Sequence, residues 1–278
     1  MTHYNVYTLL CHRDMEMASI TYPLLIKNLN NSQKLIVVGD GSLTDEDCKI
    51  LTEMSELIQV IRRSDREHFV LDKIAGFENC IKFRDEYPPA FKIIDIPLLA
   101  KENGDRLIFT DSDIIYYSGS KPYFEQDRNV YLRTDAIKIS IKLSKVLLKY
   151  NWKVPYRFNS GYFSFGLEDF DLSLIDYFVS RPDVRNIPWV IEQTGWALLF
   201  GKASKSLVPD QQQFVCAENF NGPNSGTLAI HLIADLKNKV SEWSIKEDLN
   251  VENIQVKFYE SRNVNYFDWF KKTIKRLF

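Results

Sequence analysis

Two aspartates separated by one residue, Asp111 and Asp113, follow the apolar segment 107–110. Side chains alternate along a strand, so both carboxylates are expected on the same face. At about 5 Å and an effective dielectric of about 20, two such charges repel by roughly 3 kcal/mol, and one would protonate unless a cation lies between them. A divalent metal ion is such a cation, and its remaining coordination positions suit phosphate oxygens.

A bare Asp-x-Asp is expected by chance about once in a chain this acidic, so its position matters more than its presence. Ligands of open α/β sheets bind at the carboxyl ends of strands, and the segment before Asp111 is of strand type. One enzyme family with this motif is the haloacid-dehalogenase-like phosphatases, in which a Gly-Asp-Gly-x-x-Asp motif follows. Residues 39–45 read Gly-Asp-Gly-Ser-Leu-Thr-Asp, but they precede Asp111 in the chain, so the order is reversed.

The chain more closely resembles the metal-dependent glycosyltransferases of GT-A fold, and among them family 8, the glycogenin and lipopolysaccharide galactosyltransferase group. The resemblance consists of landmarks that occur in the family's order. These are Lys92 on a helix, the Asp111-Ser112-Asp113 strand end, Asp135, the Phe-Asn-Ser-Gly segment with Asn159 and Gly161, Glu192-Gln193, Leu207-Val208-Pro209, and His231 with Lys237 six residues later.

The resemblance implies that Asp111, Asp113 and His231 bind Mn²⁺ or Mg²⁺, with the imidazole nitrogen well suited to Mn²⁺. The alternative for His231 is a hydrogen-bonded histidine at a strand end. Lys237 and Lys92 would neutralise the diphosphate of the donor as point charges, or else be ordinary helix lysines.

The remaining landmarks are implied to contact the donor. An amide at Asn159 beside a glycine that permits close approach, Gly161, suits sugar hydroxyls. Glu192 and Gln193 stand where the family has Asp-Gln and are the catalytic candidates, although a glutamate is also favourable in the first turn of any helix.

Four further residues are assigned to the nucleotide and the sugar. Asp40 would accept the uracil N3–H or would simply cap its turn. His12, at the end of the first expected strand, is a second candidate for the nucleotide pocket. Ser112 lies between the two aspartates, and Asp135 falls where the family has an acidic residue near the donor sugar. The chain departs from the family at Ala234, where a glycine is usual, and after Lys237, where Pro-Trp is usual.

The C-terminal residues form a basic amphipathic pattern. On a helical wheel, the aromatic and aliphatic side chains of 266–278 gather on one half and the basic ones on the other. Such a helix is typical of a membrane-surface element, and it would suit a lipid-linked acceptor. The alternative is a terminal helix packed on the domain with a solvated basic face.

Composition bounds the remaining possibilities. The 278 residues are 45% apolar and 26% charged, and the net charge of −2 provides no field that would attract nucleic acid. The four cysteines have no zinc or disulfide spacing, which favours a reducing compartment. With no apolar stretch of about 18 residues, we expect a cytoplasmic protein, at most peripheral on the inner face of the membrane.

The elements that must position these residues alternate between strand and helix, which predicts an α/β fold with a mostly parallel, Rossmann-like sheet flanked by helices. Thr44 with Asp47 predicts a helix N-terminus. The expected strands are 5–10, 35–38, 57–61, 107–110, 130–133, 162–165 and 227–230. The expected helices are 17–25, 44–54, 68–83, 89–101, 139–148 and 189–200.

With no linker in the sequence, we expect one GT-A domain over 1–260 and the amphipathic helix over 261–278. The predicted function is transfer of a sugar, with retention at the anomeric carbon, from a nucleotide-sugar donor such as a UDP-sugar to a hydroxyl of a saccharide, lipid-linked or protein acceptor. Such transfers build polysaccharide, lipopolysaccharide or glycolipid. A metal-dependent phosphatase and a non-catalytic nucleotide-sugar binding protein are the alternatives.

Overall fold

The structure is a computed structural model, and it describes residues 4–134, 153–185, 188–203, 205–245, 254–261, 263–264 and 271. The first four principal strands are parallel, in the order β3-β2-β1-β4. They are β1 (Val6–Leu10), β2 (Leu35–Gly39), β3 (Ile58–Ile61) and β4 (Leu107–Thr110). Their nearly continuous apolar sequences are those of strands buried on both faces.

The sheet continues beyond β4 with strands of mixed direction. The long strand β8 (Phe158–Phe165) is antiparallel to both β4 and β6 (Val130–Arg133). Next to β6 lies β9 (Leu207–Pro209), in parallel, and then β12 (Phe258–Glu260), antiparallel to β9. The eight-stranded sheet therefore has the order β12-β9-β6-β8-β4-β1-β2-β3.

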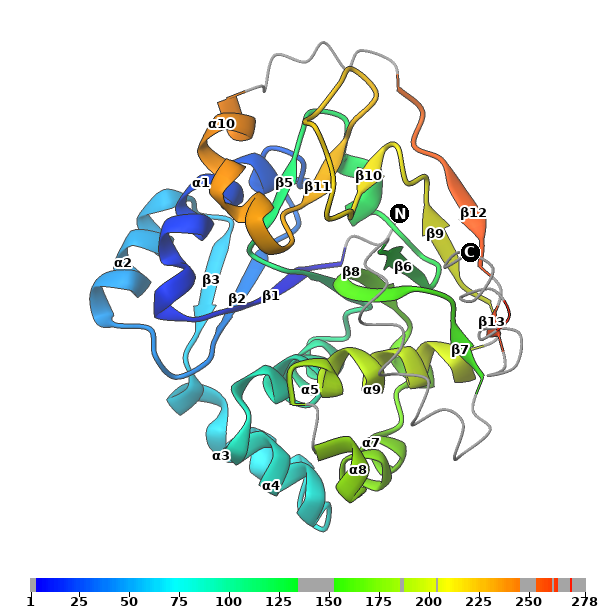
Figure 1. Cartoon of the computed structure of the whole chain (residues 1–278). Helices are drawn as coiled ribbons and strands as arrows, with labels where there is room; N and C mark the ends of the chain where they lie inside the picture. Colours follow the sequence, from blue (N-terminus) through cyan, green and yellow to red (C-terminus); the bar gives the residue numbers. More distant parts are fainter. Residues whose placement is uncertain are drawn as a thin grey trace.

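Helices cover both faces of this sheet (Figure 1). One face carries α3 (Arg63–Lys73), α4 (Glu78–Glu86), α5 (Asp95–Glu102), α7 (Leu172–Val179), α8 (Pro182–Arg185) and α9 (Pro188–Lys202). The other carries α1 (Met15–Ile26), α2 (Asp45–Met54), α10 (Val240–Ser244) and a small second sheet. Alternate residues of β2 enter opposite cores: Ile36 and Val38 pack with the first group of helices, and Leu35 and Val37 with the second.

The second sheet has the order β10-β11-β5 and carries the chain away from the end of β4. Its strands are β5 (Ile114–Tyr116), β10 (Phe214–Val215) and β11 (Ala229–His231). Because β11 is antiparallel to β5, His231 pairs with Ile114, directly after Asp113. A further pair joins β7 (Val154–Pro155) to β13 (Asn263–Val264).

Most of the expected elements within the described residues are found. Thr44 caps α2 and Asp47 returns the hydrogen bond in a complete capping box, as predicted. The single helix expected over 68–83 is wrong, because α3 ends at Lys73 and α4 begins at Glu78. Gly76, between them, has a φ of 90°, a left-handed conformation that ends a helix.

The expected helix over 89–101 is also two elements. Residues Pro88–Lys92 form the short 3-10 helix η2, and α5 follows from Asp95. The strand expected over 162–165 begins four residues earlier, at Phe158, so β8 includes Asn159 and Gly161.

Two expected helices fall largely outside the described residues, 139–148 completely and 261–278 except for a few positions. Within the second, Asn263 and Val264 belong to strand β13, and Lys271 is helical. In the described part of the chain, no helix combines the length and apolar character needed to cross a membrane.

Candidate functional site

The candidate site lies where β4 ends beside β8. The amide of Asp111 donates a hydrogen bond of 2.7 Å to the carbonyl of Gly161, which extends the β4–β8 pairing by one residue. The carbonyl of Asp113 accepts from the amide of Leu232 at 2.9 Å, which ties the same segment to the end of β11. Backbone pairing thus fixes both carboxylates relative to His231.

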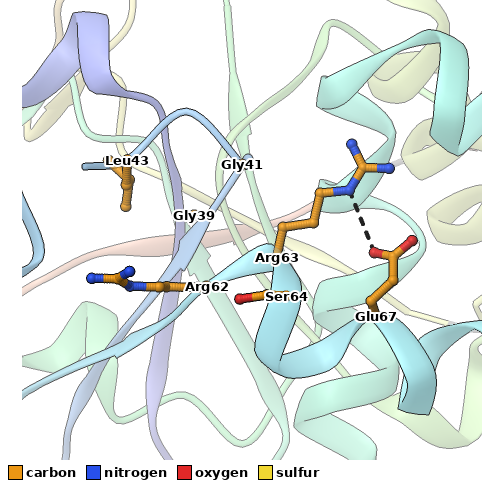
Figure 2. A pocket seen from close by; sticks show the side chains of 7 residues that line it. All are labelled: Gly39, Gly41, Leu43, Arg62, Arg63, Ser64 and Glu67. Atoms are coloured by element: carbon orange, nitrogen blue, oxygen red, sulfur yellow. Dashed lines mark hydrogen bonds and ion pairs between the residues drawn. The ribbon is translucent and has the colours of Figure 1, made fainter. Parts of the chain in front are cut away.

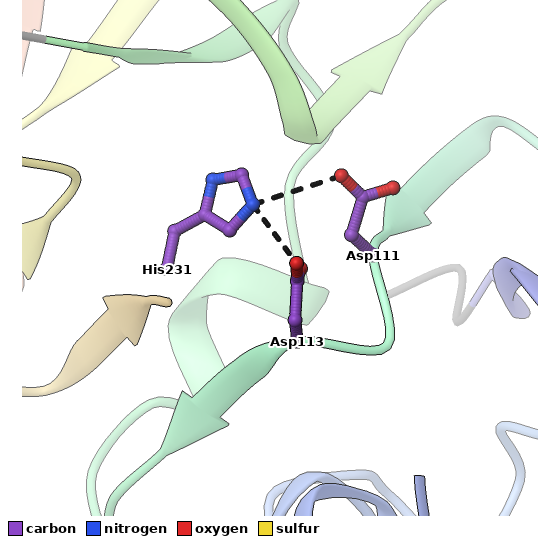
Figure 3. Close-up of side chains that lie close together, drawn as sticks. All are labelled: Asp111, Asp113 and His231. Atoms are coloured by element: carbon purple, nitrogen blue, oxygen red, sulfur yellow. Dashed lines mark ion pairs between the residues drawn. The ribbon is translucent and has the colours of Figure 1, made fainter. Parts of the chain in front are cut away.

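The side chains of Asp111, Asp113 and His231 converge (Figure 3). Their nearest ligand atoms all lie within 4.8 Å of one another. Nε2 of His231 is 3.1 Å from Oδ1 of Asp113 and 3.8 Å from Oδ2 of Asp111. The arrangement places two carboxylate oxygens and one imidazole nitrogen around one point.

Two lysines flank this cluster from different directions. Nζ of Lys92 lies 2.9 Å from Oδ1 of Asp111, and Nζ of Lys237 lies 2.8 Å from Oδ2 of Asp113. The side chain of Lys92 is buried with 6% exposure, whereas that of Lys237 is 49% exposed. Lys92 is therefore a fixed internal charge, and Lys237 can reach a ligand from the solvent side.

A second row of polar groups lies behind Lys92. The hydroxyl of Ser160 accepts from Nζ of Lys92 at 3.2 Å and donates to Oε2 of Glu192 at 3.1 Å. Oε1 of Gln193 accepts from the amide of Ser160 at 3.4 Å. Ser160 is not among the residues predicted from the sequence, although its place within the Asn-Ser-Gly landmark could have indicated it.

Two buried polar atoms of this site have no hydrogen-bond partner among the described residues: Oε1 of Glu192 and Nε2 of Gln193. Buried polar groups in folded proteins are nearly always paired, so unpaired ones at one site indicate a place for a ligand. Two hard carboxylate oxygens and an imidazole nitrogen form a donor set that fits Mn²⁺ or Mg²⁺.

Burial and neighbouring charges set the protonation of the acidic groups. Burial opposes ionisation of Asp113, but His231 and Lys237 outweigh it and lower its pKa. Burial raises the pKa of Asp111. The ammonium of Lys92 opposes this shift, and the negative charge of Asp113 adds to it. Burial likewise raises the pKa of Glu192 to about 7, with Lys92 opposing the shift.

The pKa of His231 is raised well above its usual value. Burial of the ring disfavours its charge, but the carboxylate of Asp113 overcomes that effect. Without a metal ion, the cluster therefore balances its negative charge with a protonated imidazole and two ammonium groups.

Gly161 has no space for a side chain. A Cβ there would lie 2.4 Å from Cε1 and 2.6 Å from Nδ1 of His231, far inside van der Waals contact. The side chain of Asn159 accepts from the amide of Gly161 at 2.8 Å, so its oxygen supports the local backbone. Both landmark residues thus shape the wall against which His231 packs.

His12 and Asp40 line one pocket of about 580 Å³ at the carboxyl ends of β1 and β2, the sheet edge that also carries Asp111. Oδ1 of Asp40 accepts from the amide and hydroxyl of Ser42, so this side chain caps its own turn. Nδ1 of His12 lies 2.7 Å from Asp47 of the α2 capping box.

A neighbouring pocket of about 450 Å³ was not anticipated from the sequence (Figure 2). It lies at the ends of β2 and β3, and its lining includes Gly39, Gly41, Arg62, Arg63 and Glu67. Two adjacent arginines after a strand are too common a pattern to have indicated it.

Four further positions named from the sequence lie outside the metal cluster or outside the described residues. Ser112 is buried, and its carbonyl accepts from the hydroxyl of Thr21 at 2.7 Å. Asp135 lies outside the described residues. Asp40 and Asp45, which the phosphatase alternative requires beside the metal, are not members of the Asp111 cluster.

The sheet order and the two flanking helical layers are those of solved structures with the GT-A fold. Mouse xyloside xylosyltransferase 1 superposes with a TM-score of 0.54 and 13% identity over 85% of this chain and 99% of that one. The galactosyltransferase LgtC, in complex with donor and acceptor sugar analogues, superposes with a TM-score of 0.51 and 10% identity. The match covers 87% of this chain and 95% of that one.

The glycosyltransferase GlyE of Streptococcus pneumoniae TIGR4 gives a TM-score of 0.52 and 15% identity over 99% of this chain and 64% of that one. No protein-family model matches the sequence, and a search of curated proteins found no significant match. At these identities the likeness establishes the fold alone.

Proposed function

We propose that this protein is a metal-dependent glycosyltransferase that moves a sugar from a nucleotide-sugar donor, a UDP-sugar, to a hydroxyl group of an acceptor. The observation that carries the proposal is the convergence of Asp111, Asp113 and His231 within 4.8 Å at the end of β4. The GT-A fold supports it, because ligands of such sheets bind at this edge.

A Mn²⁺ or Mg²⁺ ion held by Asp111, Asp113 and His231 would neutralise the donor diphosphate and favour its departure. Lys237 is suited to assist, because its half-exposed ammonium at the metal cluster is a point charge for a phosphate oxygen. Lys92 lies on the buried side of the cluster, where its ammonium balances the charges of Asp111 and Glu192.

Glu192 and Gln193 are the groups proposed to face the sugar. Nε2 of Gln193 is a buried donor without a partner among the described residues, and Oε1 of Glu192 accepts no hydrogen bond from them, although it lies 3.7 Å from Nζ of Lys92. A glycosyl carbon develops positive charge as the diphosphate leaves, and the carboxylate of Glu192 would stabilise that charge. Retention at the anomeric carbon is part of this proposal.

The pocket that contains His12 and Asp40 is proposed to take the nucleoside. It lies at the ends of β1 and β2, beside the strand that carries the metal cluster. The acceptor is proposed to be a saccharide, a lipid-linked sugar or a protein, in polysaccharide, lipopolysaccharide or glycolipid synthesis. For a lipid-linked acceptor, the basic C-terminal residues would contact the inner face of the membrane.

The experiment is a panel of nucleotide sugars with Mn²⁺, in which release of nucleoside diphosphate is followed with and without acceptor extracts. Wild-type protein should release UDP, EDTA should stop the release, and Asp113→Asn should lower it at least about 100-fold. Asp127→Asn, at an exposed surface aspartate, is the matched control.

Two results would overturn the proposal. Release of inorganic phosphate from simple phosphomonoesters would indicate a phosphatase. Tight binding of a UDP-sugar without turnover in the presence of any acceptor extract would indicate a binding protein.

A further inference from the structure

A buried cysteine contacts the metal cluster from the side that faces away from the metal position. Cys216 directly follows β10 and is 4% exposed. Its Sγ lies 3.5 Å from Nδ1 of His231, within hydrogen-bond distance for sulfur. The proposed reaction does not use this thiol directly.

The two nitrogens of the His231 ring have different surroundings. Nε2 points toward Asp111 and Asp113, and Nδ1 points away from them (Figure 3). Gly161 closes one side of the ring, because even a Cβ there would lie 2.6 Å from Nδ1. Among the described residues, Sγ of Cys216 is the side-chain partner of Nδ1.

A histidine can bind a metal ion through Nε2 only if that nitrogen carries no hydrogen, and the ring hydrogen of the neutral form must then be on Nδ1. That hydrogen needs an acceptor, which in most metal sites is a carboxylate or a carbonyl. Here the side-chain atom at hydrogen-bond distance from Nδ1 is the sulfur of Cys216. Sulfur is a weak acceptor, but a hydrogen bond is electrostatically stronger at a buried ring than in water.

We propose that Cys216 is a positioning residue for metal binding: its sulfur accepts the Nδ1–H of His231 and thereby keeps the Nε2 lone pair directed at the metal position. This inference rests on the proposed function, because it concerns the metal that the transfer reaction requires. Backbone pairing of β11 with both β10 and β5 holds the thiol, the imidazole and Asp113 in register.

The first test is Mn²⁺ affinity, measured as free Mn²⁺ by electron paramagnetic resonance on the full chain. Cys216→Ala should weaken Mn²⁺ binding about 10-fold, the lower end of the usual effect of removing the hydrogen-bond partner of a metal-binding histidine. Cys216→Ser restores an acceptor and should stay within about 3-fold of wild type. Cys80→Ala, at another fully buried thiol, is the control for reduced packing.

The second test observes the ring hydrogen directly. The chain has only four histidines, so nitrogen spectra of ¹⁵N-histidine-labelled protein with Mg²⁺ resolve each ring, and a His231→Gln sample assigns the relevant signals. Wild type should show His231 with its hydrogen on Nδ1. Cys216→Ala should show a shift toward the form with the hydrogen on Nε2.

The outcomes separate this inference from the proposed function. If wild type does not bind Mn²⁺, the metal-dependent function is wrong. If wild type binds Mn²⁺ and Asp113→Asn abolishes binding, while Cys216→Ala binds like wild type with an unchanged ring hydrogen, the role of Cys216 is wrong and the proposed function stands. Equal weakening in Cys216→Ala and Cys80→Ala would likewise overturn the inference, since it would reflect packing alone.

Discussion

The ammonium of Lys92 lies 2.9 Å from the carboxylate of Asp111 and 3.7 Å from that of Glu192, with its own side chain only 6% exposed. A single buried cation therefore serves two acidic groups of the site. Removing one partner of a buried ion pair is costly, because it leaves uncompensated charge.

Lys92→Met should accordingly destabilise the metal-free protein by about 2 to 4 kcal/mol. This range already allows for the weaker interaction of a partly exposed Asp111. Mn²⁺ should recover part of this stability, because the bound ion replaces the missing positive charge beside Asp111. Urea denaturation with and without Mn²⁺ measures both effects. Lys239→Met removes an exposed pair with Glu242 and should change stability by less than about 0.5 kcal/mol. A Lys92→Met protein as stable as wild type without metal would contradict the prediction.

Gly161→Ala tests the packing that orients His231. The new Cβ would lie 2.4 Å from the ring, so the imidazole must shift from its present position beside the two carboxylates. Mn²⁺ affinity should fall at least about 10-fold while the circular dichroism spectrum stays that of the folded protein. Gly226→Ala, where the nearest atom is a side-chain oxygen at 3.3 Å, should bind Mn²⁺ normally.

Glu192 should make stability depend on pH in an unusual direction. Burial raises its pKa in the folded protein to about 7 from 4.5, so between these values the folded state holds a proton that the unfolded state lacks. Unfolding then releases a proton, and the free energy of unfolding falls as the pH rises through this window.

Glu192→Gln should consequently be more stable than wild type at pH 8, by about 1 to 3 kcal/mol in the free energy of unfolding. We expect the lower end of this range, because the neutral amide no longer attracts the ammonium of Lys92 and this loss offsets part of the gain. The gain should shrink toward pH 5, where wild type is protonated in the folded state. Denaturant titrations at both pH values measure it, with Glu242→Gln at an exposed position as control. A gain that does not change with pH would argue against a raised pKa.

The buried network behind the Lys92 segment should be a major source of stability. The carboxylate of Asp95 is fully buried and accepts from Nε of Arg66 at 2.7 Å and from Nε of Arg84 at 2.8 Å. Both guanidinium groups lie 5.0 Å from the ring centroid of Phe91, the residue before Lys92. Asp95→Asn should cost about 3 to 5 kcal/mol in thermal or chemical denaturation, since two buried cations then lack their shared anion. Asp72→Asn on the exposed face of α3 should cost almost nothing.

Ala234 occupies a backbone conformation with a φ of 50°, which favours glycine. It is also a position where the resembled family usually carries glycine. Ala234→Gly should therefore raise stability by up to about 1 kcal/mol, whereas Ala18→Gly inside the buried face of α1 should lower it. A destabilised Ala234→Gly protein would contradict the strain inferred from the backbone.

Local sequence determined much of the fold. The apolar segment 107–110 forms β4 with the predicted limits, and Thr44 and Asp47 form the predicted capping box. Such features depend on residues within a few positions of each other, so their pattern is visible in the sequence. The single helix expected over 68–83 was wrong because the left-handed Gly76 separates α3 from α4 within an otherwise helical pattern.

The sequence by itself placed Asp111 and Asp113 on one strand end and, through ordered landmarks, paired them with His231. Only the tertiary structure decided that Lys92 is buried and Lys237 half exposed, that Ser160 links Lys92 to Glu192, and that Cys216 contacts the metal-site histidine. These relationships arise where β4, β8 and β11 meet through long-range pairing. Burial and charge at that junction depend on segments distant in sequence, and no local pattern of residues encodes them.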